Sequence, residues 1–187
     1  MRKIILVGGV LAAGKSTYAN ILKERFNLTA ITKDRLKEIL GDNIHVKNRE
    51  ENKKLSVICF DLLKYLLECN MTNIVIESNF KDYELIELKK LCKELNYDVL
   101  SLVFDGEDEI LHQRFIERLD KNRHYVHKSQ DFTNISAFIP VINHLRYAPY
   151  FGEIVKVNCN DFSYQTDESL FKKIEELYPY YIKVWED

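Results

Sequence analysis

One segment near the N-terminus constrains the fold more than any other feature of the sequence. The run Gly9-Val10-Leu11-Ala12-Ala13-Gly14-Lys15-Ser16 has the pattern G-x-x-x-x-G-K-S. It follows the apolar residues Ile4 to Val7, which suit a buried parallel strand. It precedes residues 15–26, whose apolar positions have helical spacing. Strand, glycine-bearing turn and helix in this order predict a loop that binds phosphate.

The chemistry of this loop follows from its residue types. The two glycines let the backbone turn tightly, so that its N–H groups converge on phosphate oxygens at the positive end of the next helix. Lys15 supplies a cation for the β and γ phosphates, and the Ser16 hydroxyl can hold Mg²⁺. We therefore predict that ATP or a related triphosphate is bound by Gly9, Val10, Leu11, Ala12, Ala13, Gly14, Lys15, Ser16 and Thr17.

The alternatives to this interpretation are a chance match and a GTPase switch. Average composition gives a chance match to the pattern about once per hundred chains of this length, but the strand before it and the helix after it argue against chance. The sequence contains no N-K-x-D motif for reading guanine, which disfavours a GTPase switch.

Strand-length apolar runs alternate with helical patterns along the rest of the chain. Alternation of this kind predicts an α/β fold with a parallel sheet covered on both faces. No linker divides the 187 residues, so we expect a single domain over 1–187, with a lid or substrate segment at about 107–152 whose part from 120 to 152 is irregular. Strands are expected at 4–7, 29–32, 73–76, 99–104 and 154–157, and helices at 15–26, 34–40 (stopping at Gly41), 50–68, 83–95, 107–119 and 170–177.

Composition limits the partners and the compartment. The formal net charge of −2 argues against general nucleic-acid binding, although a local basic patch stays open. The four cysteines are far apart and form no C-x-x-C pair, which favours reduced thiols. The apolar N-terminal run resembles a signal peptide but also completes the phosphate-loop motif. We expect a cytoplasmic protein with no membrane association.

Acidic and amide side chains follow another predicted strand. Glu77 comes directly after the apolar residues 73–76, and Asn79 follows it. The carboxyl ends of parallel strands face the ligand crevice, so we predict that Glu77 and Asn79 bind substrate, or that Glu77 holds Mg²⁺ through water. The alternative for Glu77 is a solvated acid at the end of a strand.

A basic stretch lies between residues 114 and 128. Arg114 and Arg118 are four residues apart on a predicted helix and share a face, and Arg123 follows in a turn. The planar fork of arginine stabilises the charge that builds up on a transferring phosphoryl group. The alternative is a solvated helix face paired with neighbouring acids. His124 and His127 could contact phosphate or substrate, but a structural role is favoured over an H-x-x-H metal site, for which no further ligands lie nearby.

Taken together, these motifs resemble the small P-loop kinases. They are the phosphate loop, Asp34 in ITKDRLKE, the segment IESNF at 76–80, and the arginines and histidines from 114 to 127. The nearest group contains the polynucleotide-kinase 5′-kinase domain, chloramphenicol phosphotransferase, the zeta toxins and many "AAA-domain" predicted kinases. The resemblance implies a P-loop three-layer sandwich, with a five-stranded parallel sheet in the order 2-3-1-4-5 and an arginine-bearing lid.

The resemblance also implies site roles. At the position of Asp34 the family has a carboxylate that accepts the proton of the attacking hydroxyl, whereas the alternative is a helix N-cap. Lys15, Asp34, Arg118 and Arg123 are the expected catalytic residues, and Arg114 is expected to contact the nucleotide. The leading hypothesis is an ATP- and Mg²⁺-dependent kinase for a hydroxyl of a small molecule. A nucleic-acid-end kinase, a nucleotide-sugar kinase and a nucleotide sensor with slow hydrolysis stay open.

Overall fold

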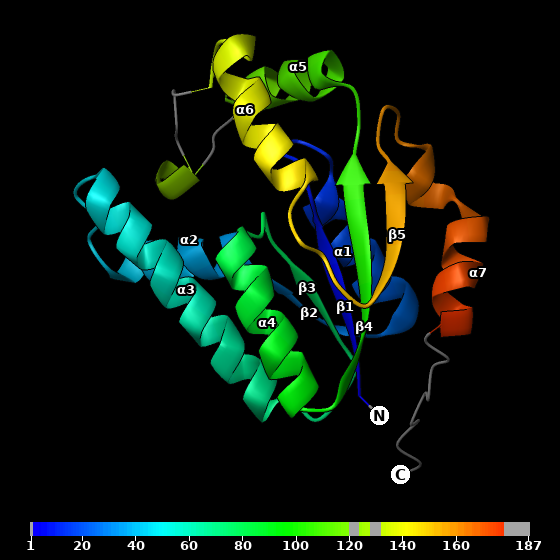
Figure 1. The fold of residues 1–187 in the computed structure, drawn as a ribbon. Coiled ribbons are helices and arrows are strands. Elements are labelled where there is room, and N and C mark those ends of the chain that lie inside the picture. Colours follow the sequence, from blue (N-terminus) through cyan, green and yellow to red (C-terminus); the bar gives the residue numbers. More distant parts are fainter. Residues whose placement is uncertain (1, 120–123, 128–131, 178–187) are drawn as a thin grey trace.

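The computed structural model describes residues 2–119, 124–127 and 132–177. Its centre is a five-stranded sheet in the order β2-β3-β1-β4-β5, and all neighbouring strands are parallel (Figure 1). The predicted fold class and strand order are both confirmed. The strands are β1 (Arg2–Gly9), β2 (Thr29–Thr32), β3 (Ile74–Glu77), β4 (Tyr97–Asp105) and β5 (Glu153–Asn158).

Helices cover both faces of this sheet. Those within the described residues are α1 (Lys15–Phe26), α2 (Lys33–Asn43), α3 (Arg49–Cys69), α4 (Asp82–Glu94), α5 (Asp108–Leu119), α6 (Ile135–Arg146) and α7 (Glu168–Leu177), with short 3-10 helices η1 (Tyr125–His127) and η2 (Ser163–Thr166). Figure 1 shows α3 and α4 side by side on one face, with α1 and α7 on the other. The predicted strands and helices are present, apart from two errors described below.

Alternation along β1 divides the core into two layers. Ile5 and Val7 pack with α1 and α7 on one face, while Ile4 and Leu6 pack with α3 and α4 on the other. All four side chains are buried, because a central parallel strand has no solvent face. This explains why the first apolar run has no polar alternation, and it fixes the phosphate loop rigidly at the end of the central strand.

The expectation that the second helix stops at Gly41 was wrong, because α2 continues to Asn43. Glycine inside a helix costs about 1 kcal/mol relative to alanine, so a reason for its presence is expected. A Cβ at Gly41 would lie 2.7 Å from Cγ1 of Val126. The glycine therefore allows η1 to pack closely on α2, and it does not end the helix.

The expectation of an irregular stretch from 120 to 152 was also wrong in part, because it contains the helix α6. Asn134 caps the helix by accepting a hydrogen bond from the Ser136 N–H at 2.9 Å. Phe138, Ile142 and Leu145 form its buried face. Pro140 lies inside the helix and obscured this pattern, since proline in a helix interior is unfavourable.

Helices α5 and α6 lie over the carboxyl ends of the strands (Figure 1). Arg146, at the end of α6, holds this pair to the sheet. Its guanidinium contacts Asp105 at the end of β4 at 2.9 Å and Asp108 at the start of α5 at 2.8 Å. The base of the helix pair is therefore fixed beside the phosphate loop.

Among the helices of the described residues, none combines the length and the apolar character needed to cross a membrane.

Candidate active site

The loop from Gly9 to Ser16 connects β1 to α1 and takes a conformation that its two glycines allow. Gly9 has φ of 112° and Gly14 has φ of 78°, both in the region that favours glycine. A Cβ at Gly9 would lie 2.0 Å from the Phe104 carbonyl oxygen, so no other residue fits there. Gly14 is the N-cap of α1, so the helix begins directly at the loop.

Two tyrosine hydroxyls hold the backbone of this loop. The Gly9 N–H donates to the Tyr150 hydroxyl at 2.6 Å, and the Tyr164 hydroxyl donates to the Ala13 carbonyl at 3.2 Å. The Val10 N–H donates to the Phe104 carbonyl at 3.0 Å. Because the N–H groups of Gly9 and Val10 are already used, we expect the loop's phosphate contacts to come from the residues after Val10.

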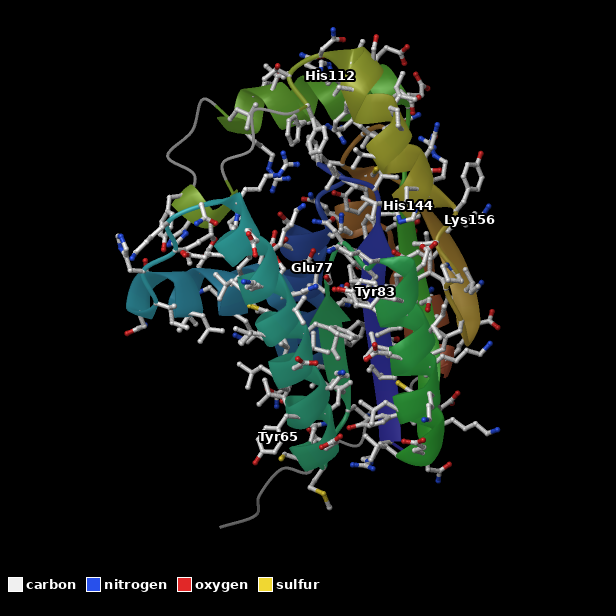
Figure 2. All side chains as sticks on the ribbon, turned by 60° about the vertical axis from the view of Figure 1, so that its left-hand side comes forward. Tyr65, Glu77, Tyr83, His112, His144 and Lys156 are labelled. Carbon is white, nitrogen blue, oxygen red and sulfur yellow. The ribbon has the colours of Figure 1, made fainter. Side chains whose placement is uncertain are left out.

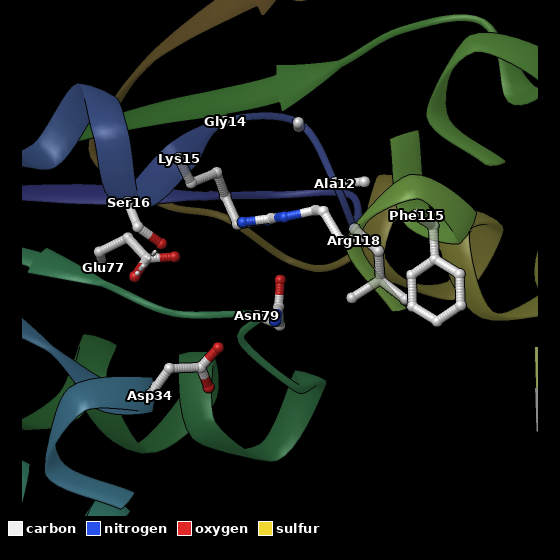
Figure 3. A pocket seen from close by; sticks show the side chains of 11 residues that line it. Ala12, Gly14, Lys15, Ser16, Asp34, Glu77, Asn79, Phe115 and Arg118 are labelled. Carbon is white, nitrogen blue, oxygen red and sulfur yellow. Dashed lines mark hydrogen bonds between the residues drawn. The ribbon is translucent and has the colours of Figure 1, made fainter. Parts of the chain in front are cut away.

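The loop opens into a pocket at the carboxyl ends of β1 and β3. Figure 3 shows that side chains from the loop, α2, β3 and α5 converge there. The lining residues are Leu11, Ala12, Ala13, Gly14, Lys15, Ser16, Asp34, Glu77, Asn79, Phe115 and Arg118. Six of the predicted polar site residues are therefore neighbours in space: Lys15, Ser16, Asp34, Glu77, Asn79 and Arg118.

Lys15, the predicted phosphate-binding cation, is buried. Its ammonium donates to the Val10 carbonyl and so lies curled within the loop. Burial lowers the pKa of Lys15, while the charges of Glu77 and Asp34 oppose this effect. A desolvated cation held at the base of the loop is suited to an anionic ligand, which would replace the lost solvation.

Glu77 lies in the interior at the end of the sheet that α5 and α6 cover (Figure 2). Its carboxylate accepts a hydrogen bond from the Ser16 hydroxyl at 3.1 Å. Burial raises the pKa of Glu77 to about 7, whereas Lys15 lowers it. Nearby, the side-chain oxygen of Asn79 is buried and has no hydrogen-bond partner in the described structure.

These oxygens fit a hard divalent cation. Mg²⁺ prefers oxygen ligands and commonly takes one or two from the protein, the rest being waters and substrate phosphates. Ser16 and Glu77 would supply a hydroxyl and a carboxylate, and the unpartnered Asn79 oxygen lies beside them. No cluster of three or more His, Cys, Asp or Glu suited to a metal occurs in 2–119, 124–127 and 132–177, so an all-protein cage is not formed by these residues.

The raised pKa of Glu77 predicts a pH-dependent effect on stability. The pKa is about 7 in the folded protein against an ordinary value of 4.5, so folding favours the protonated carboxyl. Its stabilising contribution is present below pH 4.5 and is lost as the pH rises through about 7. We expect Glu77→Gln, which cannot ionise, to be more stable than the parent at about pH 8, with the difference shrinking as the pH falls toward 5.

Thermal melts of both proteins without nucleotide or metal, over this pH range, measure the effect. A difference in melting temperature that is independent of pH would contradict the assignment of the raised pKa to Glu77.

Asp34 lies in the first turn of α2, and its side chain is 44% exposed at the pocket. The N-cap of α2 is Thr32, so the alternative of Asp34 as the N-cap does not hold. His127 of η1 lies next to α2: its Nδ1 is 3.9 Å from the Asp34 carboxylate, and its Nε2 is 3.4 Å from the Glu38 carboxylate. His124 contacts Asp42 at 2.9 Å. Both histidines therefore join η1 to α2, and the favoured structural role is consistent with these contacts.

The predicted arginines have different surroundings. Arg118 extends from α5 into the pocket together with Phe115 (Figure 3). Arg114 points elsewhere, because its guanidinium donates to the Cys159 and Asn160 carbonyls and lies 4.3 Å from the Phe162 ring. Arg123 lies outside the described residues. The exposed Thr17 does not line the pocket, so nucleotide contacts from Thr17 and Arg114 stay predictions.

Sequence reasoning missed three residues that shape this site. Tyr150 and Tyr164 lie in connections beside β5, where no periodic pattern marks them. Phe115 could have been found, because it is three residues before Arg118 and so shares its helix face.

The similarity of this chain to known proteins is a similarity of structure. No family model matches the chain, and no curated protein matches it. Among solved structures, a "putative kinase" from Chloroflexus aurantiacus has a TM-score of 0.81 at 18% identity, covering 94% of this chain and 97% of that one.

Two further solved structures are kinases of small molecules. A shikimate kinase from Bacteroides thetaiotaomicron has a TM-score of 0.59 at 16% identity, covering 94% of this chain and 97% of its own. A gluconokinase from Sinorhizobium meliloti has a TM-score of 0.57 at 16% identity, covering 95% of each. At such identities the likeness shows the fold alone, an α/β fold with a five-stranded parallel sheet in the order 2-3-1-4-5. The narrower resemblance to the polynucleotide kinase, chloramphenicol phosphotransferase and zeta toxin group stays a prediction.

Proposed function

We propose that this protein is an ATP- and Mg²⁺-dependent kinase that transfers the γ-phosphoryl group to a hydroxyl of a small molecule. One observation carries the proposal: a phosphate-loop lysine, an exposed carboxylate and an arginine from a covering helix line the same pocket. These are Lys15, Asp34 and Arg118. The fold shared with shikimate kinase and gluconokinase supports a small acceptor, and the net charge of −2 disfavours a nucleic acid.

The loop and its lysine bind the donor. Backbone N–H groups at the start of α1 face the phosphates, and the helix dipole favours their negative charge. The Lys15 ammonium would leave the Val10 carbonyl for the β and γ phosphates, since a charged acceptor forms the stronger hydrogen bond. Ser16 and Glu77 would hold Mg²⁺, which neutralises charge on the phosphate oxygens when bound.

Asp34 is the proposed base for the acceptor hydroxyl. Its carboxylate would orient the attacking hydroxyl and take its proton as the new oxygen–phosphorus bond forms. The bond between the γ-phosphorus and ADP breaks in the same transfer, so the products are ADP and a phosphomonoester. The charge of Asp34 acts on Lys15, and both residues line the pocket, which supports an acceptor carboxylate beside the phosphate-binding cation.

Arg118 covers the pocket on the side of α5. The cavity below it is only about 50 Å³, far smaller than the roughly 300–1,000 Å³ typical of small-molecule sites. We therefore expect the arginine-bearing part of α5 to move outward when ATP enters, and to return when both substrates are bound. In the returned position the guanidinium would stabilise charge on the transferring phosphoryl group.

Asp34→Asn tests the role of this carboxylate. Asparagine keeps the size and hydrogen bonding of the side chain but is not a useful base. We expect turnover to fall by about 10²-fold or more while ATP affinity and melting temperature stay close to the parent values. Steady-state kinetics with the acceptor, calorimetric titration of ATP with Mg²⁺ and a thermal melt together measure this.

The matched control is Asp61→Asn, on the exposed side of α3, where the carboxylate pairs with Lys64. It should leave all three quantities unchanged. Normal phosphorylation of the acceptor by Asp34→Asn would remove Asp34 from the catalytic machinery.

A further inference from the structure

Lys37 has an unusual environment at the edge of the active site. It lies on α2 one turn after Asp34 and is only partly exposed. Its ammonium has one hydrogen bond, to the Val126 carbonyl at 3.4 Å, which is long compared with the usual 2.7–3.2 Å. Within the described part of the chain, no carboxylate oxygen forms an ion pair with it at 4.0 Å or less. A partly desolvated cation is therefore left without a counter-ion.

Neighbouring charged groups also affect the pKa of Lys37. Burial lowers the pKa of Lys37, the charge of Asp34 raises it, and the charges of Lys33 and Lys81 lower it further. Lys33 is neutralised by a buried ion pair with Glu84. Lys81, before the first turn of α4, is exposed, and its ammonium lies 5.7 Å from the Tyr83 ring centroid. The described structure gives Lys81 no ion pair, and its charge is one of those that lower the pKa of Lys37.

Hydrogen bonds to the Val126 carbonyl hold together the segments beside Lys37. The Asn52 amide of α3 donates to the same Val126 carbonyl at 3.0 Å, which places Lys37 where α2, α3 and η1 meet. The side-chain oxygen of Asn52 is buried and has no hydrogen-bond partner in the described structure. A buried amide oxygen without a donor is costly, and a ligand hydroxyl would satisfy it. The same region thus lacks both an anion and a hydrogen-bond donor.

The alternative is an ordinary lysine whose stem packs on the protein while its charge is solvated. Solvation alone would account for the missing counter-ion. It would not account for the unpartnered side-chain oxygen of Asn52, whose amide shares the Val126 carbonyl with Lys37.

We propose that Lys37 binds an anionic group of the acceptor. The inference rests on the proposed kinase function and narrows its substrate class to hydroxylated small molecules that carry a carboxylate or a phosphate. Residues three apart on a helix have Cβ atoms about 5–6 Å from each other. With the hydroxyl at Asp34 and the anion at Lys37, only a few bonds separate the two groups in the substrate.

The direct test uses inorganic phosphate and acetate as probes. The phosphate loop is first filled with Mg²⁺ and a non-hydrolysable ATP analogue, so that the probes cannot bind there. Each probe is then titrated while the lysine side-chain signals are followed by NMR, and the backbone amide signals report probe binding in the variant that lacks Lys37. In the parent we expect a saturable shift of the Lys37 side-chain signals. In Lys37→Gln we expect the affinity for the tighter-binding probe to fall about tenfold or more. Which probe binds more tightly distinguishes a phosphate-bearing acceptor from a carboxylate.

Lys54→Gln is the matched control, because this exposed lysine of α3 pairs with Glu50 at the surface. It should bind the probes as the parent does. The proposal is overturned if neither probe shifts Lys37 saturably, or if Lys37→Gln binds them as tightly as Lys54→Gln does.

A parallel titration separates this inference from the proposed function. In Lys15→Met without nucleotide, the phosphate-loop cation is absent and probe binding at Lys37 is still measurable. If the ATP analogue fails to bind the parent, the kinase proposal fails, while the Lys37 titration still gives its own result. Once an acceptor is identified, Lys37→Gln should raise the KM for that acceptor about tenfold or more and leave kcat within a few-fold of the parent value.

Discussion

Replacing Arg118 with alanine is expected to lower kcat by about 10³- to 10⁵-fold, with a much smaller change in ATP affinity. The guanidinium extends over the pocket from α5, and its charge acts on both Lys15 and Glu77. In the closed site it would meet the transferring phosphoryl group, whose charge is stabilised by the fork of arginine donors. An interaction made mainly in the transition state affects turnover and not ground-state binding.

Arg118→Lys refines this test, because lysine keeps the charge and loses the planar fork. We expect it to be slower than the parent, too. The matched control is Arg25→Lys, at the end of α1, where the guanidinium pairs with Glu168 at the surface. That change should affect stability only. If both Arg118 variants retain the parent kcat, α5 has no catalytic part and Arg118 is a surface residue.

Lys15→Met should lower turnover by about 10²- to 10³-fold and weaken ATP binding. The methionine side chain fills nearly the same space but cannot bind phosphate. Because the buried ammonium has lost solvation, removing it should not unfold the protein. Kinetics, ATP titration and a thermal melt of the same preparation separate these effects.

Lys23→Met, in the last turn of the same helix, is the control, since this lysine is exposed and away from the loop. Two results would count against the role of Lys15. One is a parental rate in Lys15→Met; the other is a melting temperature so low that unfolding alone explains the loss.

The fold was predictable because its signals are local. Each strand is a short apolar run and most helices have a regular apolar face, so alternation gave the parallel sheet, and the resemblance gave its order. The two errors have physical causes. Gly41 serves a contact with Val126 across the fold, and Pro140 lies in a helix that packing of Phe138 and Ile142 stabilises. Tertiary contacts override local preference at both positions.

The placement of the candidate site was largely predictable for a topological reason. Parallel strands end at the same edge, so Glu77 at the end of β3, Asp34 after β2 and the loop after β1 had to be neighbours. The direction of a surface side chain was not predictable. Arg114 and Arg118 share a helix face, yet the carbonyls of Cys159 and Asn160 draw Arg114 away from the pocket. Tyr150 and Tyr164 reach the loop through long-range contacts that no spacing records.

The most direct test of the account is to identify the phosphorylated product. The protein is incubated with Mg²⁺, ATP labelled at the γ-phosphate and a panel of hydroxylated small molecules with and without an acidic group, and the label is followed by ³¹P NMR and mass spectrometry. The account predicts a labelled phosphomonoester that forms in step with ADP and is nearly absent with Lys15→Met. Labelled inorganic phosphate as the sole product in every mixture, at the same rate with and without each acceptor, would contradict it.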